Sequence, residues 1–226
     1  MRETIFDWLG KEFIGLSSEG KAGLPVPEQT GEIFQRFDRE LRDAGLSLEQ
    51  TVRTRLWARD SEGRNLGSAE RVKILSGRAR SASSSFIAPI HFDSEARVAL
   101  DLLAMRPSQP GLAKTLKEYD PPIVPLRYLI YDEVVFLSGV TSTLPALENQ
   151  VAEILSRISG SLADASTSWE KVVKVSFFLH RGQKLEALKE SFGKVIRAAS
   201  AQAEYALVDG YSAAGKLIEI EVTATK

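Results

Sequence analysis

The sequence predicts an α/β fold of the α+β type, made of two similar modules in tandem. Each module is expected to be a mixed β-sheet with two helices packed on one face. Three observations lead to this prediction: an internal repeat, an amphipathic helix that recurs in both copies, and a strand of alternating polarity after each helix. Each module is expected to run strand, strand, helix, strand, helix, strand, strand.

The repeat is a constant offset of 121 residues that runs without a gap from Glu12/Glu133 to Ala58/Leu179. Of these 47 aligned pairs 13 are identical, and they include Ser17/Ser138, Gln29/Gln150 and Arg36/Arg157. Identity at this level is weak alone, but the apolar pattern agrees in both copies. The two halves are therefore interpreted as copies of one structural unit.

The first helix of each copy shows apolar residues at helical spacing. In the first copy they are Ile33, Phe34, Phe37, Leu41 and Ala44, and in the second Ile154, Leu155, Ile158, Leu162 and Ala165. A second helix is expected at 66–75 in the first copy and at 184–200 in the second. The later one has an apolar stripe of Leu185, Leu188, Phe192, Val195 and Ala199.

The strands at 51–59 and 172–180 alternate in polarity with period two, as half-buried strands do. One face is expected to lie on the helices, and it consists of Val52, Thr54, Leu56 and Ala58 or of Val173, Val175, Phe177 and Leu179. The other face mixes aromatic and charged side chains. Such a face is rarely left bare, so it is expected to meet another repeat or subunit.

Between the copies lies a segment with five prolines and one glycine, residues 106–127, which breaks any continuous element. The predicted organisation is therefore module 1 at residues 1–105, a Pro-rich connector at 106–127 and module 2 at 128–226. The apolar side chains of Ile123, Val124 and Leu126 favour an ordered connector over a free tether.

Composition limits the function classes. The 226 residues are 43% hydrophobic and 26% charged, and the net charge of −1 provides no long-range field for nucleic acid or an anionic membrane. The absence of cysteine excludes disulfides, thiolate metal sites and a cysteine nucleophile, and two histidines cannot form a histidine-rich metal site. No apolar run is long enough for a membrane span. A cytoplasmic protein without cofactor or metal is expected.

The second half resembles the RidA family, also called YjgF. The resemblance rests on FLSG (136–139), Gln150, the strand VVKVSFFL (172–179) and the terminal IEIEVTA (218–224), taken in order and spacing. It covers nearly all of residues 128–226 and, through the repeat, most of 1–105. The resemblance implies a chorismate-mutase-like fold, trimers, and ligand clefts between subunits. Chorismatases are larger relatives, so the fold hosts more than one chemistry.

In the active branch of that family, an arginine in a P-A-R-S-C motif binds the substrate carboxylate, and the first glutamate of an I-E-I-E strand activates water. A guanidinium binds a carboxylate bidentately, and a carboxylate can act as a base toward water. The resemblance places Arg80, in ARSA (79–82), at the arginine position. The last strand of the same copy, VALDL (98–102), has Ala99 at the glutamate position and Asp101 at the second acidic position.

The second copy shows the reverse arrangement. Its last strand keeps Glu219 and Glu221, while counting back from it places Glu204 at the arginine position. The resemblance thus implies a site between unlike modules in which Arg80 of one module meets Glu219 of the other. Ser17 and Ser138 match the family's cleft serine, Gly139 follows Ser138, and Tyr119, Tyr128 and Tyr131 are candidates for an aromatic side chain over the ligand.

The implied function is hydrolytic deamination of a small carboxylated enamine or imine, by modules that self-associate into trimer-like rings. The substrate is then a small carboxylate-bearing metabolite. Two alternatives remain open: a non-catalytic protein of the same fold that binds small molecules or acts as a scaffold, and a different hydrolysis, of a C–N bond or a vinyl ether.

Overall fold

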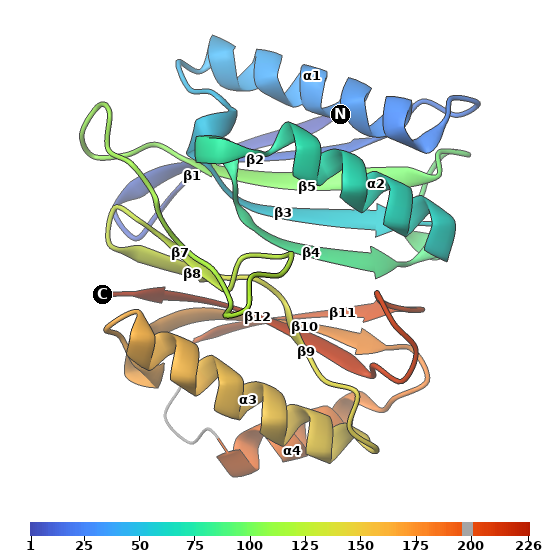
Figure 1. Ribbon diagram of the computed structural model, residues 1–226, viewed down its shortest axis with the longest axis vertical. Helices are drawn as coiled ribbons and strands as arrows, with labels where there is room; N and C mark the ends of the chain where they lie inside the picture. The colour runs from blue at the N-terminus through green and yellow to red at the C-terminus, as the bar shows by residue number, and fades with distance from the viewer. Residues whose placement is uncertain (196–200) are drawn as a thin grey trace. The chain divides into compact units, whose positions relative to one another are not determined.

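The computed structural model describes residues 1–195 and 201–226. The chain divides into two compact units, Met1–Lys114 (unit 1) and Thr115–Lys226 (unit 2). Each unit has one mixed sheet with two helices packed on one face of it (Figure 1). The predicted fold class is confirmed. Unit 1 has the predicted order of elements, strand, strand, helix, strand, helix, strand, strand, and unit 2 has this order with two additional short strands, at 115–117 and 140–141.

Unit 1 contains a five-stranded sheet in the order β1-β2-β5-β3-β4. The pair β3 and β4 is parallel, since α2 crosses over between them, and the other pairs are antiparallel. The elements are β1 (Arg2–Trp8), β2 (Lys11–Glu19), α1 (Val26–Asp43), β3 (Thr51–Ala58), α2 (Ser61–Ile74), β4 (Ala82–Ile87) and β5 (Val98–Met105).

Unit 2 repeats this arrangement in a sheet of order β11-β10-β12-β8-β7-β6, with the short strand β9 also paired to β12. Here β10 and β11 form the parallel pair, joined through α4. The elements are β6 (Thr115–Lys117), β7 (Tyr128–Tyr131), β8 (Val134–Leu137), β9 (Val140–Thr141), α3 (Leu147–Asp164), β10 (Val172–His180), α4 (Leu185–Val195), β11 (Gln202–Val208) and β12 (Ile218–Thr225).

The predicted apolar faces of the first helices form the centres of the two cores. In unit 1, Ile33, Phe34, Phe37 and Leu41 are at most 2% exposed, and they pack with apolar residues of β2, β3 and β5. In unit 2, α3 packs in the same way on β10 and β12. Side chains that alternate with these along the strands point to the opposite side of the sheet, which we call the second face.

A β-bulge corrects one detail of the predicted strand faces. The ladder between β10 and β12 shifts register between Val172 and Lys174, and the ladder between β3 and β5 shifts at the corresponding place, between Thr51 and Arg53. Val172 therefore lies in the core of unit 2, where Val173 was predicted. An extra residue in one strand turns the following side chains to the other face, and a simple alternation cannot reveal it.

The second helices differ from their predicted bounds. Helix α2 begins at Ser61, five residues before the expected start, because the Asp60 carboxylate accepts a hydrogen bond from the Gly63 N–H and caps the helix. Helix α4 is described to Val195, and the rest of the expected 184–200 helix lies outside the described residues. Among the described helices, none has an apolar stretch long enough to cross a bilayer.

Candidate functional site

Glu219 lies on β12, the strand at the centre of the unit 2 sheet. It faces Phe178 of β10 on one side and Thr141 of β9 on the other. Its neighbours Ile218 and Ile220 are in the helix-covered core, so the alternation along the strand places the Glu219 side chain on the second face. The residue is only 7% exposed.

Ser138 and Gly139 join β8 to β9 beside the same strand. The rung Phe136–Thr223 precedes them and the rung Thr141–Glu219 follows them. Ser138 is 1% exposed, and its N–H donates to the Arg127 carbonyl at 3.4 Å. The structure thus brings three predicted site residues of unit 2, Ser138, Gly139 and Glu219, to adjacent strands of one sheet.

Tyr211 is a residue of this neighbourhood that the sequence did not indicate. Its hydroxyl donates to the Phe178 carbonyl at 2.8 Å, and Phe178 is the ladder partner of Glu219. Burial and then the negative charge of Glu219 raise the pKa of Tyr211, so the phenol stays protonated at neutral pH. A lone tyrosine in the loop between β11 and β12 has no local pattern that predicts this contact.

Arg80 lies in unit 1, between a 3₁₀ helix, η2 (Gly77–Ala79), and the start of β4. The residue is half-buried, and its carbonyl accepts a hydrogen bond from Lys114 Nζ at 2.6 Å. The adjacent Ser81 is 7% exposed, with its hydroxyl 3.4 Å from that of Thr54. Arg80 therefore extends from a backbone segment that is fixed on both sides.

The last strand of unit 1 aligns with that of unit 2 as the sequence predicts. Ala99 pairs with Trp57 on β3, as Glu219 pairs with Phe178 on β10, and the two strand pairs are equivalent in the repeat. Asp101 occupies the second acidic position, where it accepts a hydrogen bond from Trp57 Nε1 at 2.7 Å. Ser17 lies beside Asp101 on β2. Unit 1 thus has no carboxylate at the position of Glu219.

The assignment of Glu204 to the arginine position is wrong. Glu204 pairs with Ser176, whose counterpart Arg55 pairs with Ser84, so Glu204 corresponds to Ser84 and not to Arg80. The Glu204 carboxylate accepts a hydrogen bond from Ser176 Oγ at 2.7 Å and lies 3.1 Å from Lys174 Nζ. The same register places the counterpart of Arg80 at residue 200, outside the described residues.

Among the candidate tyrosines, Tyr128 belongs to the helix side of unit 2. Its hydroxyl donates to Asp164 on α3 at 2.9 Å. Burial, followed by this bond and the charge of Asp164, raises the pKa of Tyr128 to about 12. Tyr131 is 1% exposed on β7, and Tyr119 lies in the segment before it. Tyr128 is thus fully explained by packing and by its contact with α3.

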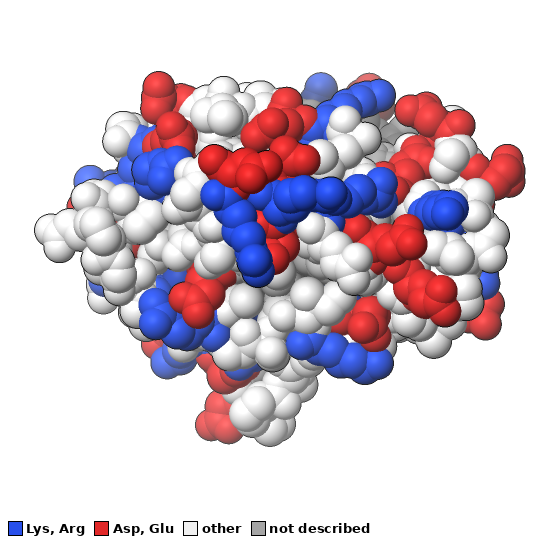
Figure 2. All heavy atoms as spheres, turned by 90° about the horizontal axis from the view of Figure 1, so that it is seen from above, with Lys and Arg blue, Asp and Glu red and all other residues white. Residues whose placement is uncertain are grey.

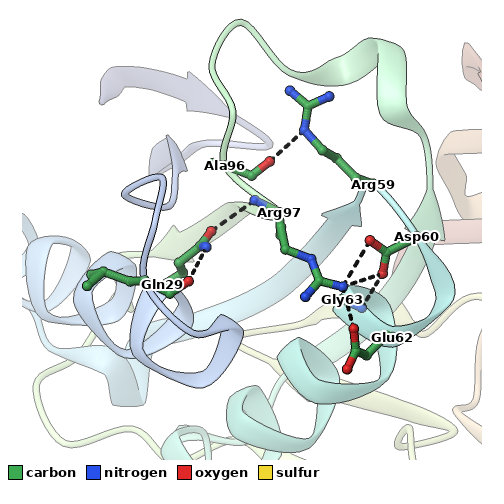
Figure 3. A network of polar contacts seen from close by, with 8 residues as sticks. Gln29, Arg59, Asp60, Glu62, Gly63, Ala96 and Arg97 are labelled. Carbon is green, nitrogen blue, oxygen red and sulfur yellow. Dashed lines mark hydrogen bonds and ion pairs between the residues drawn. The ribbon is translucent and has the colours of Figure 1, made fainter.

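A cluster of charged side chains lies at the start of α2 in unit 1 (Figure 3). Arg97 Nη2 donates to both Asp60 carboxylate oxygens, at 2.9 and 3.0 Å, and to Glu62 at 2.7 Å. Burial opposes ionisation, but hydrogen bonds from Gly63 and Arg97 leave the pKa of Asp60 below its usual value. On the face over α1 and α2, basic and acidic side chains are interspersed (Figure 2).

Comparisons with known proteins and solved structures identify the fold of the chain. No family model and no curated protein matches the sequence. A crystal structure of a chorismatase matches with a TM-score of 0.66 and 15% identity, over 98% of this chain and 79% of that one. Two single-module proteins each match 50% of this chain over 100% of their own, both with TM-score 0.46. They are a YjgF/YER057c/UK114 family member from Mycobacterium tuberculosis, 19% identical, and the Rid protein YyfA from Yersinia pestis, 20% identical.

The full-length likeness to chorismatase fits the two units described above, each with one mixed sheet and two helices on one face. The identity is too low to transfer an activity, so the likeness concerns the fold. The chain is a tandem of two similar modules, and it shares the fold of chorismatase over nearly its whole length.

Proposed function

We propose that the protein hydrolyses the C–N bond of a small carboxylated enamine or imine, at a site formed between a unit 1 module and a unit 2 module. The observation that carries the proposal is Glu219, a carboxylate only 7% exposed on the second face of a central strand. Burying a carboxylate costs free energy, which ion pairs or hydrogen bonds must offset. Such groups concentrate at functional sites.

Glu219 would act as the base in this reaction. The imine carbon accepts the oxygen of a water molecule while Glu219 takes a proton from that water, which gives a tetrahedral carbinolamine. The nitrogen then receives a proton and leaves as ammonia, and the carbon keeps its oxygen as a ketone. Imine and water thus become ketone and ammonia, with no oxidant or reductant required.

Arg80 would hold the substrate carboxylate, because a guanidinium offers two parallel N–H donors to its two oxygens. Ser138, with the Gly139 backbone, would hold the other end of the substrate, and Ser17 is the equivalent serine in unit 1. Since Arg80 and Glu219 belong to different units, the proposal requires that unlike modules meet. Self-association of several chains into trimer-like rings is one closed assembly that provides such contacts.

A second candidate is hydrolysis of a vinyl ether, and the full-length likeness to a chorismatase favours it. The same residues serve in this case, since a carboxylated substrate again needs a cation and the reaction again needs a positioned acid or base. The two candidates differ in the leaving group, which is ammonia for the enamine and an alcohol for the vinyl ether.

The test is an ammonia-release assay on freshly generated 2-aminoacrylate, with a parallel assay for pyruvate release from chorismate. Glu219→Gln is expected to lower kcat by about 10²–10⁴-fold, as the loss of a general base does. Arg80→Ala is expected to raise KM by about 10–100-fold, the equivalent of one charge-assisted pair. The matched controls are Glu186→Gln and Arg39→Ala, both at exposed positions, which should change neither constant.

The outcomes separate the candidates. Ammonia release that survives both substitutions contradicts the mechanism. Pyruvate from chorismate without activity on enamines favours the vinyl ether reaction. Carboxylate binding without any turnover assigns the protein to the non-catalytic class that uses the same fold for binding or scaffolding.

A further inference from the structure

Lys114, the last residue of unit 1, contacts two backbone carbonyls of that unit. Its Nζ donates to the carbonyl of Thr51 at 2.8 Å and to that of Arg80 at 2.6 Å. Both acceptors are the first residues beyond a 3₁₀ helix, η1 (Leu48–Gln50) and η2 (Gly77–Ala79). Carbonyls at the end of a helix lack partners within it, so one amino group provides a donor for both helix ends.

The contact joins the beginnings of two parallel strands. Strand β3 begins at Thr51 and β4 at Ala82, and the first rung between them is Arg53–Ala82. Lys114 therefore connects the segments that lead into β3 and β4, immediately before the hydrogen-bonded ladder between these strands begins. Arg80 is held between this contact and the ladder, with its φ at −53° and its ψ at 139°.

The charges that face Lys114 come from the same two 3₁₀ helices. Glu49 of η1 and Arg78 of η2 form an ion pair at 3.2 Å beside it. Burial is the main cause that lowers the pKa of Lys114, to about 7. The negative charge of Glu49 partly opposes this shift, and the positive charge of Arg78 adds to it. The ammonium has three N–H donors and the neutral amine two, so either form can serve both carbonyls.

We propose that Lys114 is a positioning residue for Arg80: its amino group fixes the backbone from which Arg80 reaches the substrate carboxylate. The role of Arg80 in this statement rests on the proposed function, whereas the contact itself is a property of unit 1. The next residue along the chain, Thr115, begins β6, which is the edge strand of the unit 2 sheet. The segment that joins the modules thereby also orders the carboxylate-binding arginine.

The absence of cysteine from the chain allows a test by chemical rescue. Lys114→Cys introduces a single thiol, and its alkylation with 2-bromoethylamine restores a primary amine at nearly the length of lysine. The full chain is compared before and after alkylation by two measurements, amide hydrogen exchange over residues 81–85 and the KM and kcat for 2-aminoacrylate. Lys21→Cys, at an exposed position, receives the same treatment as the matched control.

Lys114→Cys is expected to increase exchange over residues 81–85 about tenfold and to raise KM about tenfold with kcat little changed, the loss expected for a charge-assisted contact. Alkylation is expected to restore both values, and Lys114→Arg to retain them. Lys21→Cys should show no change. If Lys114→Cys does not fold, Lys114→Gln, which keeps N–H donors on a shorter and uncharged side chain, is expected to show the same changes at smaller size.

Each contrary result has a definite meaning. Unchanged exchange in Lys114→Cys or Lys114→Gln shows that the amino group does not hold this segment and overturns the inference. Altered exchange without a change in KM overturns the positioning of Arg80. If the wild-type protein hydrolyses neither substrate, the proposed function fails, and pyruvate affinity measured by NMR titration replaces KM as the readout of Arg80.

Discussion

Units 1 and 2 are alike where they hold their own helices and sheets together, and they differ on the second face. Both hairpins that open the units turn through two residues of positive φ, Leu9 and Gly10 in unit 1 and Asp132 and Glu133 in unit 2. Both units also have a bulge at the same place in the strand that follows the first helix. The scaffold has thus kept its irregular features as well as its regular ones.

A glutamine near the start of the first helix shows the same constancy. In unit 1, Gln29 donates to the Leu24 carbonyl and accepts from the N–H of Arg97, the residue before β5 (Figure 3). In unit 2, Gln150 accepts from the N–H of Leu217, the residue before β12. The identity of this pair in the sequence therefore has a structural cause, since each amide joins the helix start to the last strand.

The second faces, in contrast, differ in charge. Unit 2 has Glu219 and Glu221 on its last strand, at 7% and 1% exposed, where unit 1 has Ala99 and Asp101. In unit 1 the neighbouring strand contributes Arg53 and Arg55, where unit 2 has Lys174 and Ser176. These charged positions lie outside the helix-covered cores, which therefore do not constrain them. Functional differences between the modules are expected on these faces.

The largest effect on stability is expected from Ala99→Glu, which gives unit 1 a carboxylate at the position that Glu219 occupies in unit 2. Ala99 is 4% exposed and lies between Trp57 on β3 and Glu19 on β2, two residues from Asp101, which already faces Arg55, so the new carboxylate is buried near two like charges. Unit 1 should lose about 3–5 kcal/mol of unfolding free energy, as for an uncompensated buried charge. Native-state hydrogen exchange of the β5 amides measures it, with Ala99→Val as the control. Full stability would show that this position accepts a charge.

Substitution of the two equivalent glutamines, Gln29 and Gln150, is expected to give the next largest loss of stability. Gln150 makes three hydrogen bonds, to the carbonyls of Leu144 and Gly215 and from the Leu217 N–H, at 2.6 to 2.8 Å. Gln150→Leu should cost about 2–4 kcal/mol, since it removes three hydrogen bonds of a fully buried side chain, each worth about 1 kcal/mol. Gln29→Leu, with two such bonds, should cost less. Hydrogen exchange of the β12 amides in Gln150→Leu and of the β5 amides in Gln29→Leu measures the two losses of stability. Equal losses would contradict an origin in the number of hydrogen bonds.

A smaller effect is expected at the start of α2. Asp60→Ala removes the cap on Gly63 and should cost about 1 kcal/mol. Because the pKa of Asp60 is lowered in the folded protein, its contribution is present above the ordinary value of 3.8 and is lost as the pH falls through the folded value. Urea unfolding of the variant and the wild type between pH 3 and 6 should therefore converge at the acid end. A difference independent of pH would contradict this.

The sequence was sufficient for the fold because the relevant signals are local and repeated. Periodic apolar residues, such as Ile33 and Phe37, determine which helix face is buried, and the constant offset transfers that assignment to the second copy. The bulge at Val172 and the equivalence of Glu204 with Ser84 depend on strand register instead, which one inserted residue changes without altering composition. The contacts of Tyr211 and Lys114 join residues far apart in the chain, and no pattern within a window predicts them.

The last prediction concerns the pH dependence of stability that the pKa of Lys114 implies. The pKa is about 7 in the folded protein and 10.5 ordinarily, so between these values the unfolded chain binds more protons. Stability contributed by this group must then rise with pH over that interval. The difference in unfolding free energy between the wild type and Lys114→Met should accordingly increase from pH 7 to pH 10, as measured by urea unfolding. Glu49 and Arg78 face the same amine, so Lys21→Met provides the reference for general changes in charge. A flat difference would mean that the buried ammonium keeps its proton throughout, with Glu49 outweighing the cost of burial.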